Sequence, residues 1–157
     1  MSTIALRPVR DSDLDAVFEQ MRDPVSVWMA AFTAPDPDDR AAFDAHMAEV
    51  RRAPDTTTRA ITHDGRLVGT IASFVLEGDT EITYWMDRSV WGRGLAGQAL
   101  AQFLQEVAVR PLHARVASDN RGSLRVLEKN GFVVVGTEVS YAPARGTEIE
   151  ETILRLT

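Results

Sequence analysis

The sequence predicts an α+β domain of three layers, built around a mixed, mostly antiparallel sheet. Apolar residues recur with helical spacing in the first third of the chain and alternate with the period of a strand in the middle. A glycine-rich turn near residue 92 then leads back into helical spacing. The 157 residues contain no repeat and no flexible linker. We therefore expect a single domain over residues 1–157 with one ordinary core.

The N-terminal third is expected to hold one strand and two helices. A short edge-type strand runs from Ile4 to Val9. The apolar residues that follow have the i, i+3, i+4, i+7 spacing of a helix: Leu14, Val17, Phe18 and Met21. The segment from Val25 to Pro37 is apolar without a clear period, and we expect it to be irregular. Pro37 suits the first turn of a second helix, which ends before Pro54.

The middle of the chain is expected to form three antiparallel strands. The runs 57–62 and 67–76 flank Asp64-Gly65, a dipeptide typical of a two-residue hairpin. A second turn leads to the alternating run 81–86. The later elements are a helix, a strand, a helix and two strands, at about residues 95–107, 113–117, 120–130, 132–139 and 149–156. The predicted order is β-α-α-β-β-β-α-β-α-β-β.

Composition excludes several kinds of site. Without cysteine the chain has no disulfide framework, no thiolate nucleophile and no cysteine-based metal site, and we expect no metal. No apolar run approaches the length of a membrane-spanning helix. The N-terminus lacks the basic start and apolar stretch of a signal peptide. We expect a cytoplasmic protein that does not bind membranes.

Charge is unevenly distributed along the chain. The net charge is −6, yet the window from Arg88 to Lys129 holds seven basic residues against three acidic ones, a local charge of +4. A basic segment in an acidic protein suits a polyanionic cofactor. The acidic balance and the lack of a basic stripe make nucleic acid an unexpected partner.

The basic window contains a glycine-rich turn that opens a helix, Gly92-Arg93-Gly94-Leu95-Ala96-Gly97. Glycines allow close approach of the backbone, and helix N-termini attract phosphate. Two interpretations compete: a dinucleotide site, or the pyrophosphate turn of an acyl-coenzyme A transferase. Asp119, about twenty residues further on, fits the first. The alternating strand before the turn, with polar Glu81 and Thr83, favours the second.

Two motifs support the second interpretation. Gly94 and Ala96 match the end of the signature Gln/Arg-x-x-Gly-x-Gly/Ala, from which Trp91 departs at the first position. The later block is Asn120-x-x-Ser123-x-x-Val126-Leu127-x-Lys129-Asn130-Gly131-Phe132. Together they resemble the GNAT superfamily of N-acetyltransferases, and within it the Rim-type branch that acetylates ribosomal protein N-termini. The predicted element order is similar to that of the family over essentially the whole chain.

The resemblance implies that acetyl-coenzyme A binds between two splayed central strands as a co-substrate. Backbone N–H groups from Arg93 to Gly97 would hold the pyrophosphate, and the Arg88 and Arg93 side chains would assist. Main-chain groups near Met86 and Asp87 would pair with the pantetheine arm. The cofactor-binding residues expected on this basis are Met86, Asp87, Arg88, Arg93, Gly94, Leu95, Ala96, Gly97 and Asn120. Asn120 is equally well explained as a helix N-cap.

The resemblance also implies direct attack of an amine on the thioester. Many family members carry a tyrosine acid where this chain has Leu127, so Ser123 becomes the candidate proton donor to the sulfur. For the base we choose Glu81, with Tyr84 as its neighbour that orients water or substrate. Their three-residue spacing on one strand, however, places the two side chains on opposite faces.

The acceptor is expected between the segment Val25–Pro37 and the last hairpin, including Tyr141–Thr147. Trp28, Met29 and Phe32 would wall an apolar cleft, or simply cover the core. The acidic first half favours a cationic primary amine, either a protein N-terminus or a small molecule. The enzyme would be a monomer or a homodimer. The missing tyrosine supports one alternative, a non-catalytic acyl-coenzyme A binding or sensing domain.

Overall fold

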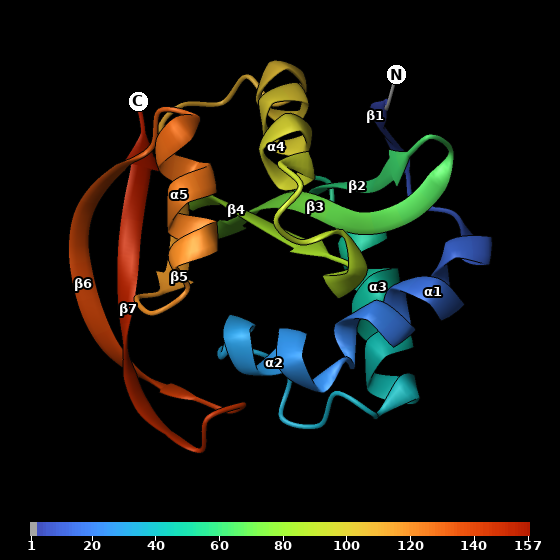
Figure 1. Ribbon diagram of the computed structural model, residues 1–157, viewed down its shortest axis with the longest axis horizontal. Helices are drawn as coiled ribbons and strands as arrows, with labels where there is room; N and C mark the ends of the chain where they lie inside the picture. Colours follow the sequence, from blue (N-terminus) through green and yellow to red (C-terminus); the bar gives the residue numbers. More distant parts are fainter. Residues whose placement is uncertain (1–2) are drawn as a thin grey trace.

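The computed structural model describes residues 3–157 as a seven-stranded sheet with helices on both faces (Figure 1). The first elements are β1 (Ile4–Pro8), the 3₁₀ turn η1 (Asp11–Asp13), α1 (Leu14–Met21), α2 (Pro24–Ala30) and α3 (Arg40–Arg52). The middle holds β2 (Thr57–His63), β3 (Arg66–Leu76), β4 (Asp79–Met86) and the 3₁₀ turn η2 (Arg88–Val90). The chain ends with α4 (Leu95–Glu106), β5 (Leu112–Ala117), α5 (Arg121–Lys129), β6 (Val133–Ala142) and β7 (Thr147–Leu156).

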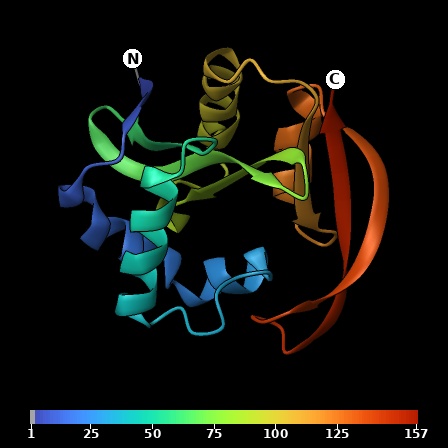
Figure 2. The same ribbon diagram turned by 180° about the vertical axis from the view of Figure 1, so that it is seen from behind.

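The strands lie in the order β1-β2-β3-β4-β5-β7-β6, and every neighbouring pair is antiparallel except β4 and β5. Helices α4 and α5 cover one face, while α1, α2 and α3 lie on the other, as both views show (Figures 1 and 2). The largest core cluster lies between the sheet and α4, around Phe103, Leu100 and Ile71. The predicted three-layer α+β fold is confirmed.

The parallel pair β4 and β5 separates soon after it forms. The strands are paired at Thr80↔Leu112 and Glu81↔His113, and the pairing goes no further. Beyond these rungs β4 continues to Met86 and β5 to Ala117. The two halves of the sheet therefore splay apart beside residues 82–86, where the cofactor was expected.

Both hairpin turns predicted from sequence form with left-handed residues. Asp64 and Gly65 have φ of +52° and +85°, and Glu77 and Gly78 have +51° and +85°. Positive φ at both central residues matches the twist of the flanking strands in a two-residue turn. These turns fix the register of β2, β3 and β4, which is why this part of the fold could be predicted.

One helix was missed in the N-terminal third. Pro24–Ala30 is the helix α2, so the prediction that Val25–Pro37 is irregular was wrong in its first part. Asp23 caps α2 by accepting a hydrogen bond from the Ser26 N–H at 3.0 Å, and Pro24 occupies its first turn. Helix α3 begins at Arg40, capped by Asp39, so Pro37 lies before it rather than in its first turn.

The final hairpin is longer than predicted. β6 and β7 are ten residues each, and their register places Ala142 opposite Thr147. The expected acceptor loop Tyr141–Thr147 therefore narrows to residues 143–146. In Figures 1 and 2 the tip of this hairpin bends toward α2. Over residues 3–157, no helix is both long and apolar enough to cross a membrane.

Candidate active site

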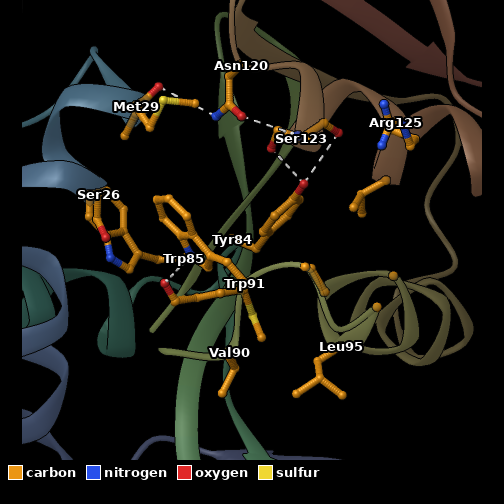
Figure 3. Close-up of a pocket in the computed structure, with 18 of the residues that line it drawn as sticks. Ser26, Met29, Tyr84, Trp85, Val90, Trp91, Leu95, Asn120, Ser123 and Arg125 are labelled. Atoms are coloured by element: carbon orange, nitrogen blue, oxygen red, sulfur yellow. Dashed lines mark hydrogen bonds between the residues drawn. The ribbon is translucent and has the colours of Figure 1, made fainter. Parts of the chain in front are cut away.

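A cavity of about 630 Å³ opens where β4 leaves β5, between α2, the glycine-rich turn and α5 (Figure 3). Its floor is the end of β4, from Tyr84 to Met86. One wall is the turn and the start of α4, and the opposite wall is the face of α5 that begins at Asn120. Its far end reaches α2 at Ser26 and Met29. The lining is mainly apolar carbon interrupted by a few polar atoms, as in sites for small organic ligands.

The glycine-rich turn presents bare backbone to this cavity. Gly94 is the N-cap of α4 in a left-handed conformation, with φ of +76°, and no side chain within residues 3–157 caps this helix. A Cβ built on Gly94 or on Gly97 would meet no atom within 4 Å. The first N–H groups of α4 have no partner within the helix, so Leu95, Ala96 and Gly97 offer donors at the positive end of its dipole. This geometry suits a phosphate group.

Tyr84 and Ser123 meet across the cavity. The Tyr84 hydroxyl lies 2.7 Å from the Ser123 hydroxyl, joining β4 to the first turn of α5 (Figure 3). Burial raises the pKa of Tyr84 above its usual range, and the Ser123 hydrogen bond only partly opposes the rise. Tyr84 therefore stays protonated at physiological pH and can serve as a fixed hydrogen-bond donor.

Asn120 is a helix N-cap that also lines the cavity. Its Oδ1 accepts a hydrogen bond from the Ser123 N–H at 3.3 Å, which makes it the N-cap of α5. Its Nδ2 donates to the Met29 carbonyl oxygen at 3.5 Å, and the residue lines the cavity. The cap thus fixes Ser123 and connects α5 with α2.

Glu81 lies apart from Tyr84 and Ser123. It is 5% exposed and is not among the residues that line the cavity. The Arg115 Nε is 3.9 Å from its carboxylate, and Arg115 also pairs with Glu138 and Glu151. Burial raises the pKa of Glu81, and the nearby Arg115 and His113 lower it by less. The opposite orientation of Glu81 and Tyr84, expected from their spacing, is present.

His113 and Asp79 complete this charged cluster. Side-chain oxygen or nitrogen atoms of Asp79, Glu81 and His113 lie within 4.8 Å of one another, a grouping that was not predicted from the sequence. His113 pairs with Glu81 at the last rung between β5 and β4. The guanidinium of Arg115 already supplies positive charge beside the Glu81 carboxylate. The cluster marks the point where the two strands part.

The expected cofactor residues divide into two groups. Those that line the cavity are Met86, Gly94, Leu95, Ala96, Gly97 and Asn120. Asp87, Arg88 and Arg93 lie outside the lining. The Asp87 N–H donates to the Val68 carbonyl oxygen at 2.7 Å, and Arg88 pairs with Asp23, the cap of α2, at 3.0 Å.

Sequence reasoning missed several lining residues. Ser26 and Ala30 come from the unpredicted helix α2, while Gly122, Arg125 and Lys129 come from α5. The α5 residues had a signal, since helical spacing from Ser123 places Val126 and Lys129 near the same face. Trp91 also lines the cavity, and its Nε1 donates to the Met86 carbonyl oxygen at 3.0 Å.

The acceptor side is held together by Arg145 in the β6–β7 loop. Its guanidinium lies over the Trp28 ring, 4.5 Å from the centroid, and its Nε donates to the Trp28 carbonyl oxygen at 2.8 Å. It also pairs with Asp119, which precedes α5, at 2.8 Å. Trp28, with 54% of its surface exposed, is thus clamped at the surface rather than placed in the core.

Comparison with known proteins now decides between the two interpretations of the glycine-rich turn. Residues 3–133 match the family model described as an acetyltransferase (GNAT) domain. The chain belongs to the GNAT family. This GNAT protein is an acetyl-coenzyme A-dependent N-acetyltransferase, so the dinucleotide interpretation is set aside.

Solved structures place this GNAT chain near Rim-type enzymes. RimJ of Mycobacterium smegmatis, in complex with CoA-disulfide, is 25% identical, with a TM-score of 0.83 over 98% of this chain and 81% of RimJ. A spermidine N-acetyltransferase from Vibrio cholerae, in complex with CoA and spermine, is 14% identical, with a TM-score of 0.84 over 98% and 94% of the two chains. A ribosomal-protein-alanine N-acetyltransferase from Brucella melitensis is 18% identical, with a TM-score of 0.81 over 96% and 98%. None of the curated protein sequences matches this chain.

Proposed function

We propose that the enzyme transfers the acetyl group to a primary amine, a protein N-terminus or a small-molecule amine, by direct attack within a ternary complex. The observation that carries the proposal is the single cavity that joins the bare α4 N-terminus to the Tyr84–Ser123 pair and to α2. A cofactor held at one end and an acceptor entering at the other would meet at the two hydroxyls.

The cofactor would lie along β4. Its pyrophosphate would accept hydrogen bonds from the N–H groups at Leu95, Ala96 and Gly97. The pantetheine arm would follow the free edge of β4 past Met86, where β5 no longer pairs with it. The thioester would then reach Tyr84 and Ser123, because these residues line the same cavity beyond Met86.

Ser123 is the proposed proton donor to the leaving sulfur. The neutral amine nitrogen attacks the thioester carbon, and the tetrahedral intermediate collapses to the amide as the carbon–sulfur bond breaks. The attacking nitrogen gives its proton to the base, and the leaving thiolate takes a proton from Ser123, which regains one from solvent. Tyr84 donates to the Ser123 oxygen and so directs the Ser123 proton toward the sulfur. This pair supplies hydroxyl chemistry in a chain that has Leu127 at the position of the usual tyrosine.

Glu81 remains the proposed base. Its raised pKa brings the carboxylate closer to the range in which a base works near neutral pH. It lies on the face of β4 that looks toward α2, so it would remove the amine proton through water on the acceptor side. The same face carries Thr83, which is exposed, so solvent reaches this part of β4.

The amine would enter between α2 and the β6–β7 loop. Arg145 ties these two segments together, and the charged cluster around Glu81 faces the same side of the sheet. That cluster holds more carboxylates than cations, and this excess of negative charge favours a positively charged acceptor. The cytoplasmic setting and the monomeric or dimeric state inferred from the sequence stay predictions.

Thiol release from acetyl-CoA across a panel of amines tests the proposal. Peptides with free N-termini, the same peptides blocked at the N-terminus, and polyamines form the panel. The enzyme has no cysteine, so a thiol reagent reports only released CoA. Turnover restricted to free amines supports the proposal. Binding of acetyl-CoA with no turnover on any amine would instead establish the sensing domain.

A further inference from the structure

Three cations on α5 are left unused by the roles assigned above. Arg121, Arg125 and Lys129 are spaced four residues apart, so they follow one side of the helix. Arg125 and Lys129 line the active-site cavity. All three also line an adjoining open hollow of about 510 Å³ along the outside of α5, shared with Leu124 and Glu128. In Figure 3, Arg125 lies across the cavity from Leu95 at the start of α4.

These side chains are free of carboxylate partners. Within residues 3–157, none of the three forms a salt bridge, whereas Arg88, Arg115 and Arg145 are each held by carboxylates. Glu128 is the single carboxylate among the residues lining the hollow. The hollow therefore carries a net positive charge and suits an anion.

Neither of the two arginines expected from sequence to assist with phosphates lines the cavity. Arg88 is bound to Asp23, and Arg93 is exposed outside the cavity lining. The pyrophosphate is already accounted for by the backbone donors of α4. Among the residues that line the cavity, the cations available to a second anionic group of the cofactor are Arg125 and Lys129 on α5.

We propose that Arg125 and Lys129, with Arg121 beside them, bind the 3′-phosphate of coenzyme A. The inference rests on the proposed placement of the cofactor and adds a second phosphate site to it. A terminal phosphomonoester carries close to two charges at neutral pH, and arginine binds such groups with paired, charge-assisted hydrogen bonds. The enzyme therefore distinguishes coenzyme A from its dephospho form, which lacks only this group.

Equilibrium binding of CoA and dephospho-CoA tests the proposal without an acceptor. We expect the wild-type enzyme to bind CoA about tenfold more tightly, the size of one good charge-assisted contact. In the double variant Arg125→Gln/Lys129→Gln the ratio falls to about one, because CoA affinity drops to the level of dephospho-CoA. Arg52→Gln on α3, which removes an exposed charge on the opposite face of the sheet, keeps the wild-type ratio.

Each other outcome has a distinct meaning. Equal affinities of the wild-type enzyme for the two ligands would overturn the α5 site while leaving the proposed function intact. An equal loss of affinity for both ligands in the double variant would also overturn it, since α5 would then hold the pyrophosphate. Failure of the wild-type enzyme to bind either ligand would contradict the cofactor placement itself.

Discussion

The Tyr84 and Ser123 hydroxyl oxygens lie 2.7 Å apart and link the central strand to the first turn of α5. The strand supplies a half-buried, protonated phenol, and the helix supplies a small hydroxyl fixed by the Asn120 cap. Two residues 39 positions apart in the chain thus form one polar unit inside a largely apolar cavity. The proposed mechanism depends on this unit.

Ser123→Ala should lower kcat by about 100-fold, since positioned proton donors contribute about 10²–10⁴. Tyr84→Phe should cost less, about tenfold, because Tyr84 acts through Ser123. The KM for acetyl-CoA should change little in either variant. Steady-state kinetics with a good amine measure both effects, and thermal unfolding checks that the variants fold. Comparable activity of Ser123→Ala and wild type would remove Ser123 from the mechanism.

Gly94→Glu should abolish binding of CoA, because it places a carboxylate where the pyrophosphate would lie. The matched control is Gly94→Asn, since asparagine tolerates the left-handed conformation with φ of +76° and brings no charge. The control should retain most of the affinity in a calorimetric titration. Unchanged binding by the glutamate variant would mean that the phosphate lies elsewhere.

Glu81→Gln should remove the acidic limb of the pH profile. A raised pKa means that the folded enzyme keeps the Glu81 proton to higher pH than the unfolded chain does, so the base becomes active only above the ordinary glutamate range. In the wild type kcat/KM should therefore rise with pH through the raised pKa. The variant should be slower and lack that rise. A retained limb would assign the base to another group.

The same raised pKa has a stability consequence. Burial favours the neutral form of the Glu81 carboxyl group. The contribution of Glu81 to the free energy of unfolding is therefore most favourable below the pKa of the unfolded chain, and it declines as pH rises through the raised pKa of the folded protein. Glu81→Gln should flatten this decline. Urea unfolding at several pH values measures it, and a pH dependence identical to that of the wild type would contradict the assignment.

Asp23→Ala should destabilise the protein by about 1 kcal/mol through loss of the α2 cap. The Ser26 N–H lowers the pKa of Asp23 most among its partners, ahead of Arg88. Arg88→Gln, which breaks only the exposed ion pair with Asp23, should cost little. Because α2 forms one end of the cavity, the alanine variant should also raise KM for the amine. Chemical denaturation and acceptor kinetics measure the two effects.

Local signals explain which parts of the molecule could be predicted. The hairpin at Asp64-Gly65 and the turn before α4 depend on backbone conformations that their own residues prefer, so the antiparallel run from β2 to β4 and the glycine-rich turn that opens α4 could be predicted from sequence. Helix α2 lacks a polar face and depends on the Asp23 cap and on contacts with Asn120 and Arg145 from distant segments. The sequence alone does not distinguish Arg88 from Arg125 as a candidate phosphate ligand. Only the fold shows that Arg88 forms a salt bridge with Asp23.

The early separation of β4 from β5 implies that a cofactor bound as proposed also stabilises the fold. Two rungs join the N-terminal half of the sheet to the C-terminal half, and the free edge of β4 beyond them is where the pantetheine arm would pair. A ligand that pairs there, as proposed, would complete the interrupted sheet and add to the folded structure as well as react. Saturating coenzyme A should therefore slow amide hydrogen exchange in both halves of the sheet together. The slowing should correspond to the free energy that ligand binding adds to the stability of the folded state.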